Sequence, residues 1–307
     1  MRCLFAILLA ATIAGSINAQ DKTWVGKTIF TTRGGIRIGH TGDDGKQVFV
    51  ATLSRFEYRV LAEKDGWIKV AERGVAGWFD KADAVLLDTA IDFFTQRIRK
   101  NPKDAHAYTA RGAAWHSKGE FDIAIKDQTE ALRLDPSAYA YVNRGITWRH
   151  KKDYDKAIAD QNEAIRLDPK DADAYHERGL AWQRKKEFQK AVSDYCEVTR
   201  LDPKDPEAYN AAAWLLATAP NAKDRNGRRA LELAKKAVEL EEAKDQALRD
   251  RYGGYMDTLA AAFAESGNFQ EAVQWQARAL KEADLKDDPG APRRLELYRN
   301  KQPFRLD

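Results

Sequence analysis

Residues 107–136 read AYTARGAAWHSKGEFDIAIKDQTEALRLDP, and the chain then repeats this pattern twice. Residues 140–169 read AYVNRGITWRHKKDYDKAIADQNEAIRLDP, and residues 174–203 read AYHERGLAWQRKKEFQKAVSDYCEVTRLDP. The copies begin at residues 107, 140 and 174, so they recur with a period of 33 to 34 residues. Self-similarity at such a period predicts a stacked array in which each unit buries its apolar side against its neighbours.

Each copy holds two stretches with helical spacing of apolar residues, split by a polar turn and closed by Asp-Pro. Proline has no amide hydrogen and disfavours the helical conformation in the residue before it, so Asp-Pro ends the second helix. Gly112, Gly145 and Gly179 fall in the middle of the first helix, where glycine costs about 1 kcal/mol relative to alanine. A cost repeated three times indicates close approach of the paired helix, whose matching residue is a small alanine in every copy.

The spacing of aromatic, glycine, alanine and proline residues resembles the tetratricopeptide repeat family over residues 89–300. The resemblance implies an all-α solenoid, a right-handed superhelix of helix pairs. One departure recurs, because Arg111, Arg144 and Arg178 stand where the family usually has leucine. In the second helix, Gln128 and Gln161 replace a large residue that is Tyr195 in the third copy, which indicates a more polar surface between repeats.

The array extends beyond the three regular copies. We expect a half-repeat capping helix and junction at residues 89–104 and five units at 105–137, 138–171, 172–205, 206–243 and 253–286. A capping helix and tail follow at 289–307, in which Leu295 covers the last repeat and Arg294 stays in solvent.

Residues 1–19 have the pattern of a secretory signal peptide: Arg2 precedes an apolar run, and small and polar residues lead up to Ala19. Cleavage after Ala19 predicts an exported protein, periplasmic, in the cell envelope or secreted, with no membrane span in the mature chain. Retention of this segment as an anchor is the alternative.

Residues 20–88 lose the helical pattern and show short runs rich in β-branched and aromatic residues, separated by Gly/Asp clusters. Such runs predict a small β-barrel or sandwich, so the whole chain is an α+β multidomain protein. The stretch Asp65-Gly66-Trp67-Ile68-Lys69-Val70, followed by Gly77-Trp78-Phe79, resembles the bacterial SH3-like family. That resemblance implies binding of peptides or cell-wall fragments, or a spacer role. Trp67 and Trp78 either fill the barrel core or form its binding surface.

Charge and motifs argue against several classes of function. Lys plus Arg number 51 and Asp plus Glu number 47, and the two signs are interspersed, so we expect no nucleic-acid partner. The chain contains no nucleophile elbow, zinc-protease motif, Walker loop or C-x-x-C. We therefore expect no enzyme, cofactor or metal, and we expect Cys196 to be a buried, inert thiol.

The resemblance to tetratricopeptide repeats also implies which first-helix positions line the concave groove. They are His106, Thr109, Ala113, His116 and Ser117 in the first copy, Tyr139, Val142, Ile146, Arg149 and His150 in the second, and Asp173, His176, Leu180, Gln183 and Arg184 in the third. Asn143 matches an asparagine with which some members clamp a peptide carboxylate, but Ala113 and Glu177 do not match the rest of that clamp.

Four of the five histidines fall in this set. They are either a solvated polar surface, a groove whose ligand affinity changes between about pH 5.5 and about 7.5, or, least favoured by the spacing, a metal site.

These features predict an exported, non-enzymatic adaptor that holds a protein or peptide in the groove, with Arg149 and Arg184 pairing acidic groups. Two alternatives stay open. In one, the SH3-like domain binds peptidoglycan or another wall polymer and the repeats are a spacer. In the other, the chain is a regulatory subunit of an envelope enzyme.

Overall fold

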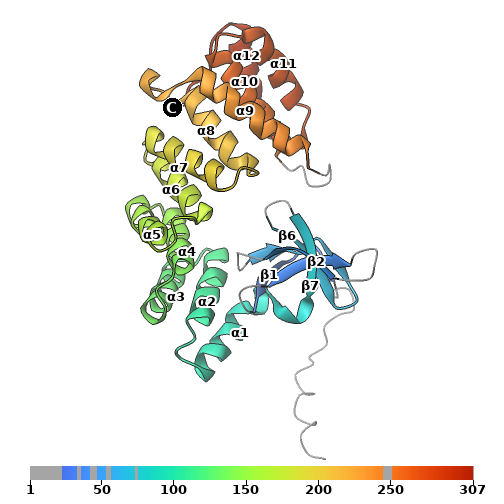
Figure 1. The fold of residues 1–307 in the computed structure, drawn as a ribbon, viewed down its shortest axis with the longest axis vertical. Coiled ribbons are helices and arrows are strands. Elements are labelled where there is room, and N and C mark those ends of the chain that lie inside the picture. Colours follow the sequence, from blue (N-terminus) through green and yellow to red (C-terminus); the bar gives the residue numbers. More distant parts are fainter. Residues whose placement is uncertain are drawn as a thin grey trace, which may run out of the picture. The chain divides into compact units, whose positions relative to one another are not determined.

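A computed structural model describes residues 23–32, 36–41, 47–52, 57–72, 75–244 and 251–306. The chain divides into two compact units, residues 1–89 and residues 90–307. The signal peptide expected at residues 1–19 lies outside the described residues. Figure 1 shows the strands of the first unit and the successive helix pairs of the second.

The first unit is a small β region built from two antiparallel sheets, with strand orders β4-β1-β8 and β3-β2-β7-β6-β5. The strands are β1 (Thr28–Thr31), β2 (Arg37–Thr41), β3 (Gln47–Thr52), β4 (Glu57–Arg59), β5 (Ala62–Lys64), β6 (Trp67–Glu72), β7 (Val75–Asp80) and β8 (Ala84–Leu86).

Alternation along β6 decides which side of the five-stranded sheet is the core. Ile68 and Val70 are buried and pack with Ile38 and Phe79. Because successive side chains of a strand point to opposite faces, Trp67 lies on the other face, and 43% of its surface is exposed. Of the two interpretations of Trp67, the core one is therefore wrong.

The second unit is a series of helix pairs, the arrangement of a tetratricopeptide-type solenoid. Its helices are α1 (Leu87–Lys100), α2 (Ala105–Ser117), α3 (Phe121–Leu134), α4 (Ala138–His150), α5 (Tyr154–Leu167), α6 (Ala172–Arg184), α7 (Phe188–Leu201), α8 (Pro206–Thr218), α9 (Gly227–Glu242), α10 (Tyr252–Glu265), α11 (Phe269–Ala279) and α12 (Gly290–Arg299). None of the described helices is both long and apolar enough to cross a membrane.

Local sequence explains where these helices begin and end. The side chains of Asp104, Ser137 and Asp171 accept backbone N–H groups of the first turns of α2, α4 and α6. At the other ends, Asp135 and Asp168 are extended, the conformation that a following proline favours. The Asp-Pro pairs thus end the second helices, as predicted.

The glycines of the first helices allow the close approach expected from the sequence. A Cβ on Gly112 would lie 2.9 Å from Cγ of Gln128, and one on Gly179 would lie 2.8 Å from the ring of Tyr195. Gln128 and Tyr195 are buried, so the second helix fills the space that each glycine leaves open.

The arginine before each of these glycines links the two helices of its repeat to each other and to the preceding helix. In the second copy, Arg144 Nε and Nη2 donate to both oxygens of Asp160 at 2.8 and 2.7 Å, and Nη1 donates to Thr129 at 3.2 Å. Arg111 contacts Asp127 and Thr95 in the same way, and Arg178 contacts Asp194 and Asn162. The polar surface between repeats is therefore a series of bidentate ion pairs.

One expectation for the last helix is wrong. Leu295 is buried as predicted, but Arg294 is only 7% exposed instead of lying in solvent. Its guanidinium donates to Asp257 at 2.7 Å and to Asp288 at 2.6 Å, so two carboxylates compensate its burial.

Candidate functional site

The first helices of the repeats form the inner row of the array. Three of the four pairs of consecutive first helices contact each other, α2 with α4, α4 with α6 and α8 with α10. Consecutive second helices make at most weak contacts within the described ranges. Because elements on the inside of a curved stack lie closest together, the first helices line its concave side, which we call the inner face.

At the first two repeats, the inner face carries a histidine pair. Nε2 of His116 lies 2.6 Å from Nδ1 of His150, so one ring donates a proton that the other accepts. Phe121 stacks against His150 with ring centroids 6.2 Å apart. Burial, together with the charges of His150 and Arg149, lowers the pKa of His116 to about 4. Burial and Arg149 also lower the pKa of His150, against an opposing effect of Glu177.

The next contact along the inner face involves Arg149, which the sequence predicts to pair an acidic group of the ligand. Nε of Arg149 donates to Glu177 at 2.8 Å, and the two side chains are 17% and 18% exposed. Arg149 therefore links α4 to α6, which makes it unsuited to pair an acidic ligand. Arg184 is exposed and forms no ion pair with any residue that the structure describes.

The third repeat arranges its groove residues around a buried tyrosine. Tyr195 donates its hydroxyl hydrogen to Oε1 of Gln183 at 3.0 Å, and the ring of His176 meets its ring edge-on, with centroids 5.6 Å apart. Leu180 is half-buried and packs against the same cluster. Gln183 and His176 thus have defined partners, whereas Leu180 keeps part of its surface accessible.

The other predicted groove residues divide into core and surface. Thr109 and Val142 are only 5% and 6% exposed, so they pack between helices and offer almost no surface to a ligand. Asn143 donates to the carbonyl of Tyr139 at 2.7 Å, which occupies its amide within α4. Tyr139, Ile146 and His106 are half-buried. Burial and the charge of Arg97 lower the pKa of His106, with Asp104 opposing them.

Sequence reasoning missed the carboxylates that hold Arg111, Arg144 and Arg178. The signal was present, because each arginine precedes its aspartate by the same number of residues in all three copies. Cys196 is free and half-buried, and Nη2 of Arg229 lies 3.1 Å from its sulfur. Across the described residues, no group of three His, Cys, Asp or Glu side chains is placed to hold a metal ion.

Comparison with known proteins identifies the repeats. A family model of the TPR repeat matches residues 149–186, and a model of the tetratricopeptide repeat matches residues 172–205. The chain therefore contains tetratricopeptide repeats, which typically serve as non-enzymatic protein-interaction scaffolds.

Among the solved structures that resemble this chain, two show the extent of the likeness. The chain resembles YrrB, described as a TPR protein with an unusual peptide-binding site, at 20% identity over 65% of this chain and 96% of that one, with a TM-score of 0.52. It also resembles the Cut9–Hcn1 hetero-tetramer of APC/C at 14% identity over 69% of this chain and 39% of that one, with a TM-score of 0.54. At these identities the likeness shows the helix-repeat fold alone.

Proposed function

We propose that the chain is an exported adaptor that binds a protein or peptide partner on the inner face of repeats 1–3 and catalyses no reaction. Stacked helical repeats create extended concave surfaces suited to such binding. Export rests on the signal-peptide pattern of residues 1–19.

The observation that carries this proposal is the mixture of side chains left accessible on the inner face. Tyr139 and Ile146 in α4 and Leu180 in α6 are half-buried, so each offers apolar surface to a partner. Removing such surface from water yields about 25 cal/mol per Å². Arg184 adds an exposed guanidinium that can pair a carboxylate in a bidentate way. An extended or helical segment with apolar residues and one acidic group fits this arrangement.

The pair of His116 and His150 supports a role as a neutral polar surface and not as a switch near neutral pH. Because the pKa of His116 is about 4, its ring is neutral throughout the range of about pH 5.5 to about 7.5. The pair of His116 and His150 therefore contributes a neutral, hydrogen-bonded part of the surface near pH 7, and its charge changes only in more acidic conditions.

The test is an affinity capture from envelope extract with the mature full chain as bait. The inner-face variant is Leu180→Ala with Arg184→Glu, and the control carries Arg166→Glu with Leu167→Ala. Arg166 and Leu167 are exposed at the end of α5, and Leu167 is 41% exposed, so the control matches in composition and lies on a second helix. We expect the inner-face variant to capture at least about tenfold less of a partner that wild type and control retain equally. Equal capture by all three proteins would contradict the proposal.

A second candidate function rests on the five-stranded sheet. The strand register places Phe49 opposite Gly39, Gly39 opposite Trp78 and Trp78 opposite Lys69. The side chains of Phe49, Trp78 and Lys69 therefore share the face of the sheet that points away from the core. Phe49 is 51% exposed. Trp67 lies on the same face as Lys69, two residues along β6.

Such an aromatic face suits a carbohydrate-containing wall polymer or a peptide, with the SH3-like resemblance in support. Co-sedimentation of the full chain with cell walls tests it: Phe49→Ala with Trp67→Ala should abolish sedimentation, whereas Leu180→Ala with Arg184→Glu should leave it unchanged. Loss of sedimentation in the second variant instead would assign wall binding to the repeats.

A further inference from the structure

After α12 the chain turns back and runs over the repeats in extended form. The amide of Lys301 donates to the carbonyl of Tyr298 at 3.0 Å, and that of Gln302 donates to Leu297 at 2.8 Å. Lys301 has a φ of 52°, the left-handed conformation with which many helices end. A lysine in this conformation costs roughly 1 kcal/mol, so the contacts made after the turn must hold the segment in place.

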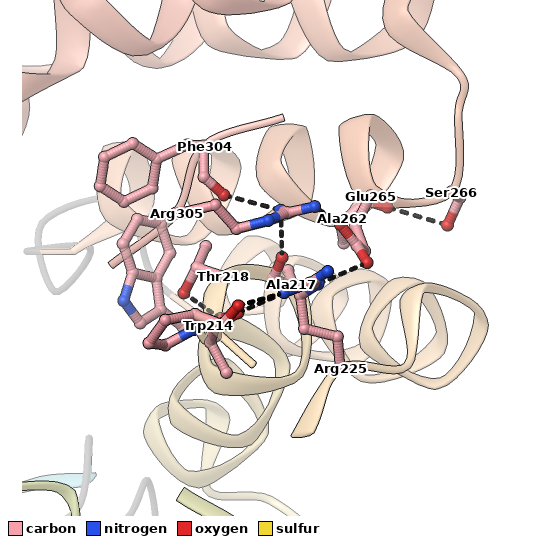
Figure 2. Close-up of polar contacts among 11 residues, drawn as sticks. Trp214, Ala217, Thr218, Arg225, Ala262, Glu265, Ser266, Phe304 and Arg305 are labelled. Atoms are coloured by element: carbon pink, nitrogen blue, oxygen red, sulfur yellow. Dashed lines mark hydrogen bonds and ion pairs between the residues drawn. The ribbon is translucent and has the colours of Figure 1, made fainter. Parts of the chain in front are cut away.

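Three consecutive residues of this segment make those contacts, as Figure 2 shows for the first two. The ring of Phe304 meets that of Trp214 at a centroid distance of 5.7 Å. Nη2 of Arg305 lies 2.5 Å from Oε2 of Glu265, and its Nη1 donates to the carbonyl of Ala217 at 3.3 Å.

Leu306 completes the series. Its amide donates to the carbonyl of Thr218 at 2.9 Å. Its side chain packs against the cluster that includes Tyr195 and Leu215, with Leu180 at the edge of the same cluster.

The surface under this segment corresponds to the groove positions of the regular repeats. When Ala208-Tyr209 is aligned with Ala107-Tyr108, the residues equivalent to Ala113, His116 and Ser117 are Trp214, Ala217 and Thr218. When Phe269 is aligned with Phe121, Glu265 is also equivalent to Ser117. The C-terminal segment therefore lies on the inner face of the fourth and fifth repeats.

The polar groups on this surface are arranged as a receptor for a peptide. The last carbonyls of an α-helix have no partner within the helix, and at the end of α8 those of Ala217 and Thr218 are satisfied by Arg305 and by the amide of Leu306. Ala217 and Thr218 are buried with the segment in place, so any segment that covers them must also supply donors to these acceptors.

Glu265 is positioned independently of the segment. Nε of Arg225 donates to its Oε1 at 2.9 Å, while Nη1 of Arg225 is held by the carbonyls of Ala219 and Pro220 at 2.8 and 2.7 Å. The second oxygen, Oε2, is the one that receives Arg305. A preorganised carboxylate of this kind favours a guanidinium ligand.

We infer that this surface, formed by Trp214, Ala217, Thr218 and Glu265, is a peptide-binding site for an extended segment with an aromatic residue, an arginine and an aliphatic residue in succession. Residues 304–306 occupy the site in the structure, and a partner segment of the same chemistry replaces them. This inference deepens the proposed function, on which it rests only for the existence of a partner.

A partner segment can replace residues 304–306 because these residues are held by a tether as well as by their contacts. The tether raises their effective concentration without strengthening the contacts themselves. A partner segment that continued past the position of Leu306 would run toward Leu180 and add contacts with the third repeat.

A fluorescent peptide with the sequence NKQPFRLD, residues 300–307, provides the probe, and anisotropy against the full chain provides the readout. The released variant carries Phe304→Ala, Arg305→Glu and Leu306→Ala. We expect it to bind the peptide at least about tenfold more tightly than wild type, whose own segment competes. Adding Trp214→Ala and Glu265→Gln to the released variant should remove this binding, and so should an Arg-to-Glu change in the peptide.

Arg299→Glu is the matched control, because Arg299 is exposed on α12 and forms no ion pair with a described residue. It should bind the peptide as weakly as wild type does. Equal affinity of wild type and released variant, or binding that survives Trp214→Ala with Glu265→Gln, would overturn the inference. If the triple variant melts well below wild type, Arg305→Ala alone replaces it as the released variant. Its affinity for the peptide should be about threefold higher than that of wild type.

The outcome is separable from that of the proposed function, since the probe is the chain's own sequence. Peptide binding without capture of a partner on repeats 1–3 would contradict the adaptor proposal alone. Partner capture without peptide binding would contradict the peptide site alone.

Discussion

The first three repeats and the last two differ in how the first helix of a repeat contacts the second. The difference lies at one equivalent pair of positions. In repeats 1–3 the residue before the central glycine is an arginine that forms a bidentate pair with an aspartate of the second helix. At the equivalent positions of repeats 4 and 5 the chain has Ala212 with Leu233 and Leu259 with Trp275. The same helix pair is thus joined by charge in one half of the array and by apolar contact in the other.

The difference also affects the inner face. The last two repeats bury a large apolar cluster and are overlaid by residues 304–306, whereas the first three leave Tyr139, Ile146 and Leu180 partly accessible. Two kinds of contact therefore support one fold.

The largest expected effect comes from breaking one ion pair. Arg144→Met leaves the carboxylate of Asp160, whose side chain is only 7% exposed, without its counter-charge. We expect the free energy of unfolding to fall by about 3 kcal/mol, measured by urea denaturation.

The double variant Arg144→Leu with Asp160→Leu converts this repeat to the apolar type of repeats 4 and 5. Apolar replacement of a buried ion pair is often neutral, so it should lie within about 1 kcal/mol of wild type. A double variant as unstable as the single one would show that the two kinds of junction are not interchangeable.

A smaller effect should follow from filling the helix contact in the third repeat. Alanine in place of a mid-helix glycine normally stabilises by about 1 kcal/mol, but a Cβ at Gly179 would lie 2.8 Å from the buried ring of Tyr195. We expect Gly179→Ala to destabilise by about 2 kcal/mol in thermal or chemical unfolding.

Gly254→Ala in α10 is the control, because the nearest atom to its Cβ would be 3.7 Å away. It should be neutral or stabilising. A stabilised Gly179→Ala variant would mean that the close approach of α6 and α7 is looser than described.

These contrasts show how far sequence could predict this molecule. The recurring alanines and Asp-Pro pairs are local signals, so they predicted the helices and their ends. The pairing of Arg144 with Asp160 joins residues far apart in the chain, and only folding reveals which of many carboxylates an arginine meets. The prediction that Arg294 stays in solvent is wrong for the same reason, since its partner Asp257 lies in another helix. Residues 302–306 have no periodicity, so nothing in their sequence indicated that they lie on the repeats.

The smallest expected effect concerns the pH dependence of the regular repeats. The pKa of His116 falls from 6.5 to about 4 on folding, so between these values the unfolded chain binds a proton that the folded chain does not. Stability should therefore fall as the pH falls through this window. After allowance for solvent screening, we expect about 1 kcal/mol between neutral pH and the lower end of the window.

The variant His116→Asn should lose this part of the pH dependence. Unfolding free energies of wild type and variant, measured from about pH 7 down to about 4.5, give the comparison. Parallel curves would show that His116 titrates normally in the folded protein.

The most direct test of the central claim is site-specific photo-crosslinking in living cells. p-Benzoylphenylalanine would replace Leu180 on the inner face and, in a second strain, Ile123, which is 39% exposed on the second helix α3. We expect one protein partner to be crosslinked from position 180 and not from position 123. Equal crosslinking from both positions, or crosslinking from position 123 alone, would contradict the assignment of the inner face as the binding surface.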